Sequence, residues 1–205
     1  MLGTSGDLAG ARGLLVTSAD TARLRGYFAT EAWLLHDTVR LGDATSVAGR
    51  LAELAEHCEG DLVASYAAHA AASVRGRPQE LVDVVDRFEA MGTFLLAAEV
   101  ATEAAQAFQG GGDRRSSAAL GVRAASLAAQ CEGARTPGLA VPVMVAPLTP
   151  RERDVASLAA RGASSREIAD RLYLSVRTVN NHLQSVYSKL GISGRRELAN
   201  ALAEL

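Results

Sequence analysis

The chain has 205 residues, 48% of them hydrophobic, a formal net charge of −2 and two cysteines. These values suit a protein with one or two buried cores and exclude a disulfide-rich or strongly charged class. The longest apolar stretch, residues 139–148, contains two prolines and is too short to cross a bilayer, and no signal-peptide pattern opens the chain, so we expect a cytoplasmic protein without a membrane contact.

Aromatic residues make up only 4% of the chain, whereas alanine occurs in runs. A core of this composition is built from close helix contacts rather than from large rings. The expected fold class is therefore all-α.

Regularly spaced glycine turns divide residues 1–131. The turns at Gly6-Asp7, Gly42-Asp43, Gly76-Arg77 and Gly112-Asp113 are separated by 36, 34 and 36 residues. This period is typical of helical hairpins of the tetratricopeptide type, in which each hairpin covers the apolar face of the next. We predict a tetratricopeptide-like repeat domain over 1–131, with helices at 8–18, 20–40, 43–57, 61–75, 78–90, 92–109 and 113–131.

A segment rich in proline and glycine follows. Four of the five prolines fall within residues 137–150, and the segment lacks helical periodicity, so residues 132–147 are predicted to be a linker. The linker also separates two charge regimes. Residues 1–148 contain 12 Arg and 17 acidic residues, a net charge of −5, and residues 149–205 contain 9 Lys and Arg and 6 acidic residues, a net charge of +3.

Residues 148–205 carry dense helix-boundary signals. Thr149-Pro150-Arg151-Glu152 and Ser164-Ser165-Arg166-Glu167 each match a capping box, in which a hydroxyl and a Glu three residues later satisfy each other's backbone amides. We predict four helices, at 150–161, 165–172, 176–190 and 195–204. Only three residues separate the second from the third, which is typical of a helix-turn-helix.

The helix at 176–190 has two distinct faces. Val179, Leu183, Val186 and Leu190 form an apolar stripe that we expect to face the core. The opposite face is polar, and we expect it to include Arg177, Asn180, Asn181, Gln184, Ser185 and Ser188. Amide side chains offer the paired donor and acceptor that base edges present in the major groove. The alternative is an ordinary solvated face.

The order and spacing of these signals resemble the LuxR/FixJ-type (GerE-like) DNA-binding domain of bacterial regulators. The landmarks include Leu148-Thr149, Glu167-Ile168-Ala169, Leu174-Ser175, Thr178-Val179 and Lys189-Leu190. The resemblance implies a sequence-specific, DNA-binding transcriptional regulator that places helix 176–190 in the major groove of double-stranded DNA as a homodimer.

The resemblance also implies roles for individual residues. It assigns base contacts to Asn180, Asn181 and Gln184, contacts with the DNA backbone to Ser175, Arg177, Thr178, Ser188 and Lys189, and dimerisation to Leu198, Ala201, Leu202 and Leu205. Position 180 is often Lys in this family, so Asn180 predicts fewer phosphate charges and a shallower salt dependence.

The two parts together resemble the C-terminal portion of the large MalT-like LuxR regulators, in which an ATPase module precedes a helical-repeat sensor. This resemblance implies that residues 1–131 sense or bind a protein or small-molecule effector. A third hypothesis is an ATP-driven switch. The sequence has no phosphate-binding loop, so no nucleotide site can be assigned to it. The main alternative is a helical-repeat protein-protein adaptor dimerised by its C-terminal helices.

The remaining candidate residues favour structural roles. No nucleophile or carboxylate pair has a suitably placed base, so we predict no enzyme activity, no catalytic residue and no cofactor. His57, Cys58 and His69 lack the spacing of metal ligands. We therefore expect no metal site and assign packing roles to these residues. Trp33, the only Trp, is predicted to anchor the core of the first hairpin, and His182 to be a structural histidine.

Overall fold

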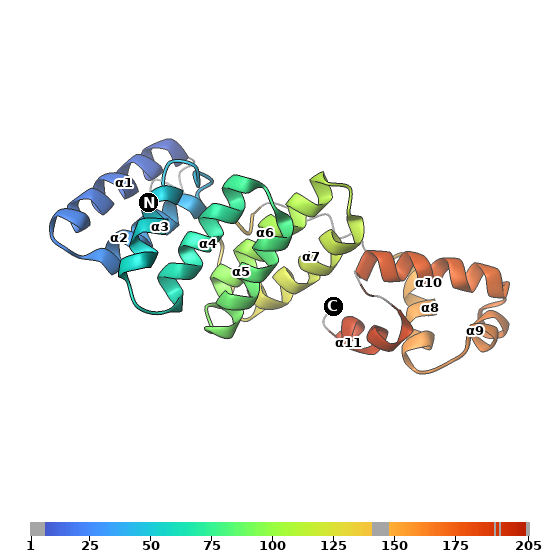
Figure 1. Cartoon of the computed structure of the whole chain (residues 1–205). Helices are drawn as coiled ribbons and strands as arrows, with labels where there is room; N and C mark the ends of the chain where they lie inside the picture. Colours follow the sequence, from blue (N-terminus) through green and yellow to red (C-terminus); the bar gives the residue numbers. More distant parts are fainter. Residues whose placement is uncertain (1–6, 141–147, 191, 193, 204–205) are drawn as a thin grey trace.

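The computed structural model describes residues 7–140, 148–190, 192 and 194–203, and these residues form helices and connecting turns without a strand. Figure 1 shows an extended row of stacked helices followed by a smaller helical group at the C-terminal end. The all-α prediction is confirmed. Within the described residues, no helix combines the length and apolar character that crossing a membrane requires.

Seven helices make up the first part of the chain. They are α1 (Leu8–Leu24), α2 (Phe28–Arg40), α3 (Ala48–His57), α4 (Asp61–Arg75), α5 (Pro78–Ala90), α6 (Phe94–Gly110) and α7 (Arg114–Ala129). Local chemistry explains several of the starts. The carboxylates of Asp7 and Asp113 accept backbone amides of the first turns of α1 and α7, and Pro78 occupies the first turn of α5.

Each of the six turns between these helices contains a glycine with positive φ, a conformation that L side chains rarely adopt. These glycines form two interleaved series: Gly42, Gly76 and Gly112 lie at every second turn, and Gly26, Gly60 and Gly92 lie at the others. The sequence analysis used only the first series. It consequently placed the first helix break near residue 19, where α1 in fact continues to Leu24, and the correct break lies at Gly26.

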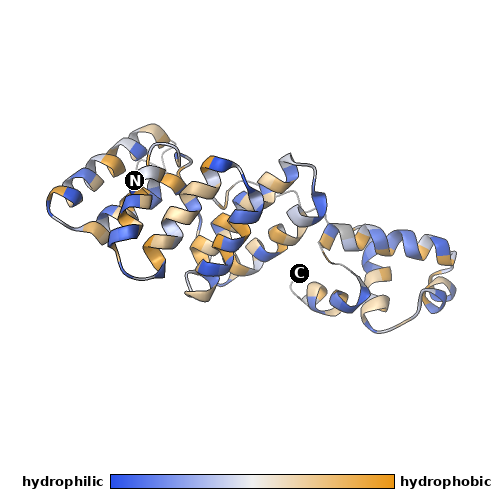
Figure 2. Cartoon of the chain, viewed as in Figure 1, coloured by the Kyte–Doolittle hydropathy of each residue, from blue (hydrophilic) through white to orange (hydrophobic). Residues whose placement is uncertain are grey.

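One apolar cluster joins the helices of this part. Its buried members come from every helix, and the fully buried ones include Ala19, Leu35, Leu51, Ala70 and Phe88. Consecutive helices pack against one another, and α2 also contacts α4. The alanine-rich helix α6 contributes Ala97, Ala98, Ala101, Ala104 and Ala105 to the same core. The colouring in Figure 2 shows the apolar and polar residues alternating around these helices.

Trp33 does not anchor this core. Its side chain on α2 is 54% exposed, and the neighbouring Tyr27 and Phe28 are also exposed. The prediction of a buried tryptophan is wrong because residues 28–40 present the opposite side of α2 to the core, through Ala32, Leu35 and Val39.

The second part of the chain has its own apolar cluster. Its elements are α8 (Pro150–Ala160), α9 (Ser165–Leu172), α10 (Val176–Leu190), a short 3-10 helix η2 (Arg195–Glu197) and α11 (Leu198–Ala203). The last predicted helix is thus split into a 3-10 turn and a short α-helix. Val155, Ile168, Val179, Val186 and Leu198 are all fully buried at the centre of this cluster.

Candidate nucleic-acid interface

Two capping boxes fix the starts of α8 and α9. The Thr149 hydroxyl accepts the Glu152 amide while the Glu152 carboxylate accepts the Thr149 amide, and Ser164 and Glu167 repeat the arrangement. Each box satisfies two amides that the first turn leaves unpaired. Both predictions from the sequence are confirmed, because capping depends only on residues close together in the chain.

A tight turn joins α9 to α10. Tyr173 ends α9 in the left-handed conformation with φ 54°, and the Leu174 amide donates back to the Ala169 carbonyl at 2.9 Å. The Ser175 hydroxyl then accepts the Thr178 amide at 3.0 Å and so caps α10. The turn leaves α9 and α10 in contact, with Ala169 buried where they meet.

The inner face of α10 is the one that the sequence predicts. Val179, Leu183, Val186 and Leu190 are all buried against α8, α9 and α11. This packing fixes the rotation of α10 about its axis. The packing also determines which side chains of α10 face away from the core.

The outer face presents amides and a guanidinium. Asn180, Asn181, Gln184 and Arg177 are all exposed, and Thr178 is half-buried. They lie between the start and the middle of α10, whereas its C-terminal end lies beside α7 of the repeats. Figure 1 shows the α9 end of α10 at the far end of the molecule, away from the repeat helices. The three amides predicted to meet base edges thus share one accessible surface.

Ser185 and Lys189 lie on a different side of α10 from these amides. The Ser185 hydroxyl donates to Glu152 Oε1 at 2.6 Å, and Lys189 Nζ forms an ion pair with Glu152 Oε2 at 2.6 Å. The expectation that Ser185 points outward is wrong, because its hydroxyl turns toward α8. The charge of Lys189, predicted to meet a phosphate, lies instead against a buried carboxylate.

Glu152 therefore joins α8 to α10. Its side chain is 7% exposed and accepts from the Thr149 amide, the Ser185 hydroxyl and the Lys189 ammonium. Burial raises the pKa of this carboxyl, but the hydrogen bonds from Lys189, Ser185 and Thr149 outweigh it and lower the pKa to about 2. Glu152 is consequently ionised at neutral pH.

The stripe predicted to dimerise faces the interior of its own domain. Leu198 is fully buried, Ala201 is 7% exposed, and Leu202 packs partly buried against the same cluster. We correct the prediction for Leu198 and Ala201, because side chains that fill a core do not present a surface to a second subunit. Leu205 and the side chain of Ser188 lie outside the described residues.

Two exposed side chains beside the amide face escaped the sequence analysis. Val176 opens α10 and is 43% exposed, and Tyr173 in the turn is 96% exposed. Val176 lies three residues before Val179 and so continues the apolar stripe, which means that periodicity gave no signal of its exposure. Tyr173 gave no signal either, because the left-handed turn determines its exposure. His182 is half-buried.

A short helix packed across a second one, with a polar outer face and an apolar inner face, defines a helix-turn-helix protein. The family model described as bacterial regulatory proteins, luxR family, matches residues 146–202. The spore germination protein GerE of Bacillus subtilis is 42% identical over 50 residues, which cover 24% of this chain and 68% of that protein. Through this domain the chain belongs to the luxR family.

Other relatives also match part of this chain. The transcriptional regulatory protein UhpA of Salmonella typhimurium is 43% identical over 70 residues, covering 33% of this chain and 36% of UhpA. A Mycobacterium bovis protein named as an HTH-type transcriptional regulator is 50% identical over 56 residues, or 27% of this chain. The chain spans only 6% of the length of that mycobacterial protein. No solved structure gives a significant match.

Proposed function

We propose that this chain is a sequence-specific DNA-binding transcriptional regulator that inserts α10 into the major groove. The observation that carries the proposal is the shared exposure of Asn180, Asn181 and Gln184 on the outer face of α10, in a domain of the luxR family. Asn and Gln form bidentate hydrogen bonds with adenine in the major groove. The exposed Val176 adds an apolar contact of the kind that thymine methyl groups make.

The residues at the start of α10 are proposed to hold the DNA backbone. Arg177 is exposed, and Ser175 and Thr178 lie at the helix N-terminus, where backbone amides and the helix dipole favour a phosphate. Ser188 is proposed for the same role. Lys189 keeps a place in this group, but because Glu152 already accepts its ammonium, we expect a smaller phosphate contribution from Lys189 than from Arg177.

Selection of bound sequences from a random DNA pool, followed by titration of single variants, tests this proposal. Asn181→Ala and Gln184→Ala should each cost about 1–3 kcal/mol on the selected site and little on random DNA. Arg177→Ala should weaken both and reduce the slope of log K against log salt by about 0.9. Gln79→Ala, at an exposed position on α5, is the matched control.

Equal losses on selected and random DNA for the amide and arginine variants would contradict the assignment of roles. A selected site with two symmetric half-sites would support the proposed homodimer on DNA, and a single unpaired half-site would contradict it. The alternative is a helical-repeat adaptor dimerised by its C-terminal helices, and the burial of Leu198 and Ala201 in the domain core weighs against that dimer contact.

We further propose that residues 1–131 are a tetratricopeptide-like sensing platform, that 132–147 link it to the DNA-binding domain over 148–205, and that the whole resembles the C-terminal part of a MalT-like regulator. The two interleaved glycine series and the packing of consecutive helices support this reading. The two separate apolar clusters support the domain boundaries.

A further inference from the structure

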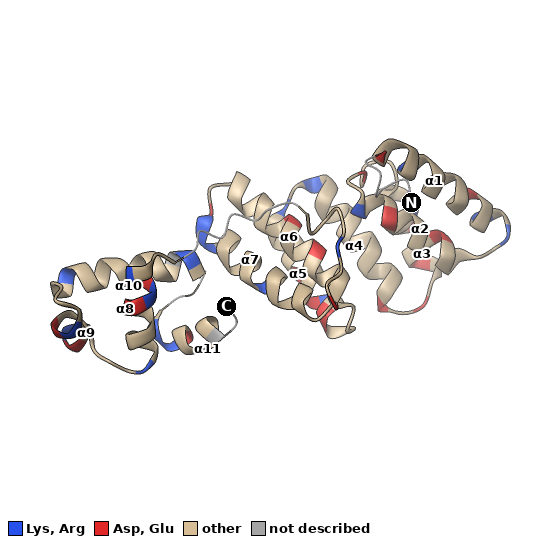
Figure 3. Cartoon of the chain, turned by 180° about the vertical axis from the view of Figure 1, so that it is seen from behind, with Lys and Arg blue, Asp and Glu red and all other residues tan. Residues whose placement is uncertain are grey.

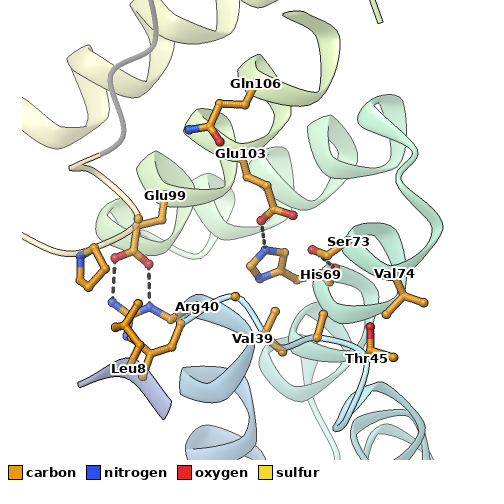
Figure 4. A pocket seen from close by; sticks show the side chains of 15 residues that line it. Leu8, Val39, Arg40, Thr45, His69, Ser73, Val74, Glu99, Glu103 and Gln106 are labelled. Carbon is orange, nitrogen blue, oxygen red and sulfur yellow. Dashed lines mark hydrogen bonds and ion pairs between the residues drawn. The ribbon is translucent and has the colours of Figure 1, made fainter. Parts of the chain in front are cut away.

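A cavity of about 520 Å³ lies among the even-numbered helices of the repeats. Its walls come from α2 and the turn after it, from α4, from α6 and from the linker at Pro137 and Gly138. Small-molecule sites in proteins typically have volumes of about 300–1,000 Å³. Figure 4 shows its polar side chains, among them Arg40, Glu99 and Glu103.

Equivalent positions of successive repeats form a chain of hydrogen bonds that reaches this cavity, of which only His69 and Glu103 line the wall. His36 on α2, His69 on α4 and Glu103 on α6 are 33 and 34 residues apart and form a chain of hydrogen bonds. The two imidazoles lie 2.9 Å apart, from His36 Nε2 to His69 Nδ1, and His69 Nε2 lies 2.9 Å from Glu103 Oε2. The buried His36 also stacks on Tyr66.

The surroundings favour the charged form of Glu103 and the neutral form of His36. Burial, His69 and Arg40 all lower the pKa of His36. Burial raises the pKa of Glu103, but the hydrogen bonds from His69 and Ser73 outweigh it, so that the pKa is lowered. With the Glu103 carboxylate as the acceptor, His69 donates from Nε2. The Glu103 side chain is 39% exposed, so its carboxylate is accessible.

The second charged group in the cavity is a guanidinium paired with carboxylates. Arg40 donates Nε and Nη2 to the two oxygens of Glu99, at 2.6 and 2.9 Å, and Nη1 to Asp37 at 2.6 Å. Carboxylates therefore engage three of the five N–H groups of the guanidinium, which disfavours an anionic ligand at this position. Two carboxylates around one guanidinium leave a charge of −1, and Glu103 is a third carboxylate at this site.

The lining of the cavity narrows the choice of ligand further. Apolar side chains, including Leu8, Val39 and Val74, occupy part of the wall, and the described lining contains no Phe, Tyr or Trp on which a sugar ring or a base would stack. The half-buried Gln106 beside Glu103 supplies an additional polar group. We propose that this cavity binds a small organic cation, an aliphatic amine or guanidine, whose nitrogen donates to Glu103.

The linker forms part of the same site. A Cβ added to Gly138 would lie 3.1 Å from Glu99 Cγ, so the backbone there lies directly against the Arg40–Glu99 pair. Leu139 packs against the repeat core, and the Ala140 amide donates to the Thr136 carbonyl at 3.0 Å. A ligand in the cavity thus contacts the segment that leads to the DNA-binding domain. This regulatory part of the inference rests on the proposed function, whereas the binding site does not.

Calorimetric titration of the intact chain with pentane-1,5-diamine, pentane-1,5-diol and glutarate tests the proposal, because the three probes share a length and differ in charge. For a probe with so few non-hydrogen atoms, typical ligand efficiencies predict a Kd on the order of 1 mM. The diamine should bind with one site per chain, at least about tenfold more tightly than the diol or glutarate.

Glu103→Gln retains an acceptor for His69 but loses the charge, and should weaken diamine binding about tenfold or more. Gln106→Phe, which fills the cavity from its edge without touching either ion pair, should also weaken it. Glu56→Gln, at an exposed position on α3, is the control and should bind like the unmodified chain. Circular dichroism checks that each variant is folded.

Equal binding of diamine and diol would overturn the proposal, and so would equal losses in Glu103→Gln and Glu56→Gln, or no heat up to ~20 mM diamine, well above the expected Kd. The titration contains no DNA, so failure of the proposed DNA binding leaves its outcome unaffected, and the reverse also holds. A separate experiment tests whether the ligand affects the linker. Pentane-1,5-diamine should change the rate of protease cleavage at Arg135 in the linker, and an unchanged rate would exclude an effect of the ligand on the linker.

Discussion

Replacing Glu152 by Gln removes a charge from the contact between α8 and α10 without changing the size of the side chain. The amide retains one oxygen, which can accept from only part of the present set of donors. Its NH₂ group then faces a donor, either the Thr149 amide and Lys189 ammonium or the Ser185 hydroxyl. The substitution therefore tests the charge of Glu152 and its capacity to accept hydrogen bonds, without a change in side-chain size.

The expected loss follows from the contacts. A hydrogen bond to a charged group contributes about 1.5–3 kcal/mol, and removing one member of a buried ion pair costs about 3–5 kcal/mol. Lys189 is 22% exposed and regains some hydration, which reduces the loss. We expect Glu152→Gln to destabilise the C-terminal domain by about 2–4 kcal/mol.

Glu167→Gln is the matched control. Glu167 belongs to the same kind of capping box, accepting the Ser164 amide at 2.6 Å, but it is exposed and accepts from neither a Lys nor a Ser of α10. This substitution should cost less than about 1 kcal/mol, as exposed caps do. Hydrogen exchange of α10 peptides, read by mass spectrometry in the intact chain, measures the free energy of opening for both variants.

The pH dependence supplies a further check. Because the pKa of Glu152 in the folded domain is about 2, below its ordinary value of 4.5, its stabilising contribution is complete above pH 4.5 and is lost as the pH falls toward 2. The difference between the unmodified chain and Glu152→Gln should shrink over this window. Equal losses in the two Gln variants, or a difference that does not change with pH, would refute the role assigned to Glu152.

Three other substitutions test the packing. Leu198→Ala should destabilise the C-terminal domain by about 2–5 kcal/mol, because Leu198 is fully buried, and a variant that loses only self-association in sedimentation would contradict this. Arg40→Met strands Glu99, which is 6% exposed, and should cost the repeat domain about 3–5 kcal/mol in urea unfolding followed by circular dichroism. Tyr173→Gly relieves a left-handed residue and should stabilise α9–α10 by about 1 kcal/mol; hydrogen exchange that speeds up instead would show a stabilising role for the ring.

The amino-acid sequence determined the helix starts, many of the turns and the two faces of α10. The boxes at Thr149 and Ser164 depend on residues three positions apart, and the α10 stripe depends on helical periodicity. Such interactions form within one element, so their signals are local. The break at Gly26 was missed although its glycine is visible, because only one of the two glycine series was used.

The tertiary structure alone decided which side chains meet. Glu152 lies 33 residues from Ser185 and 37 from Lys189, and nothing in their spacing shows that α8 and α10 bring them together. The same holds for the chain of bonds from His36 through His69 to Glu103 across three helices. An apolar stripe such as that of α11 specifies that a face must be covered, but the packing of the whole domain determines whether its own core or a second subunit covers it.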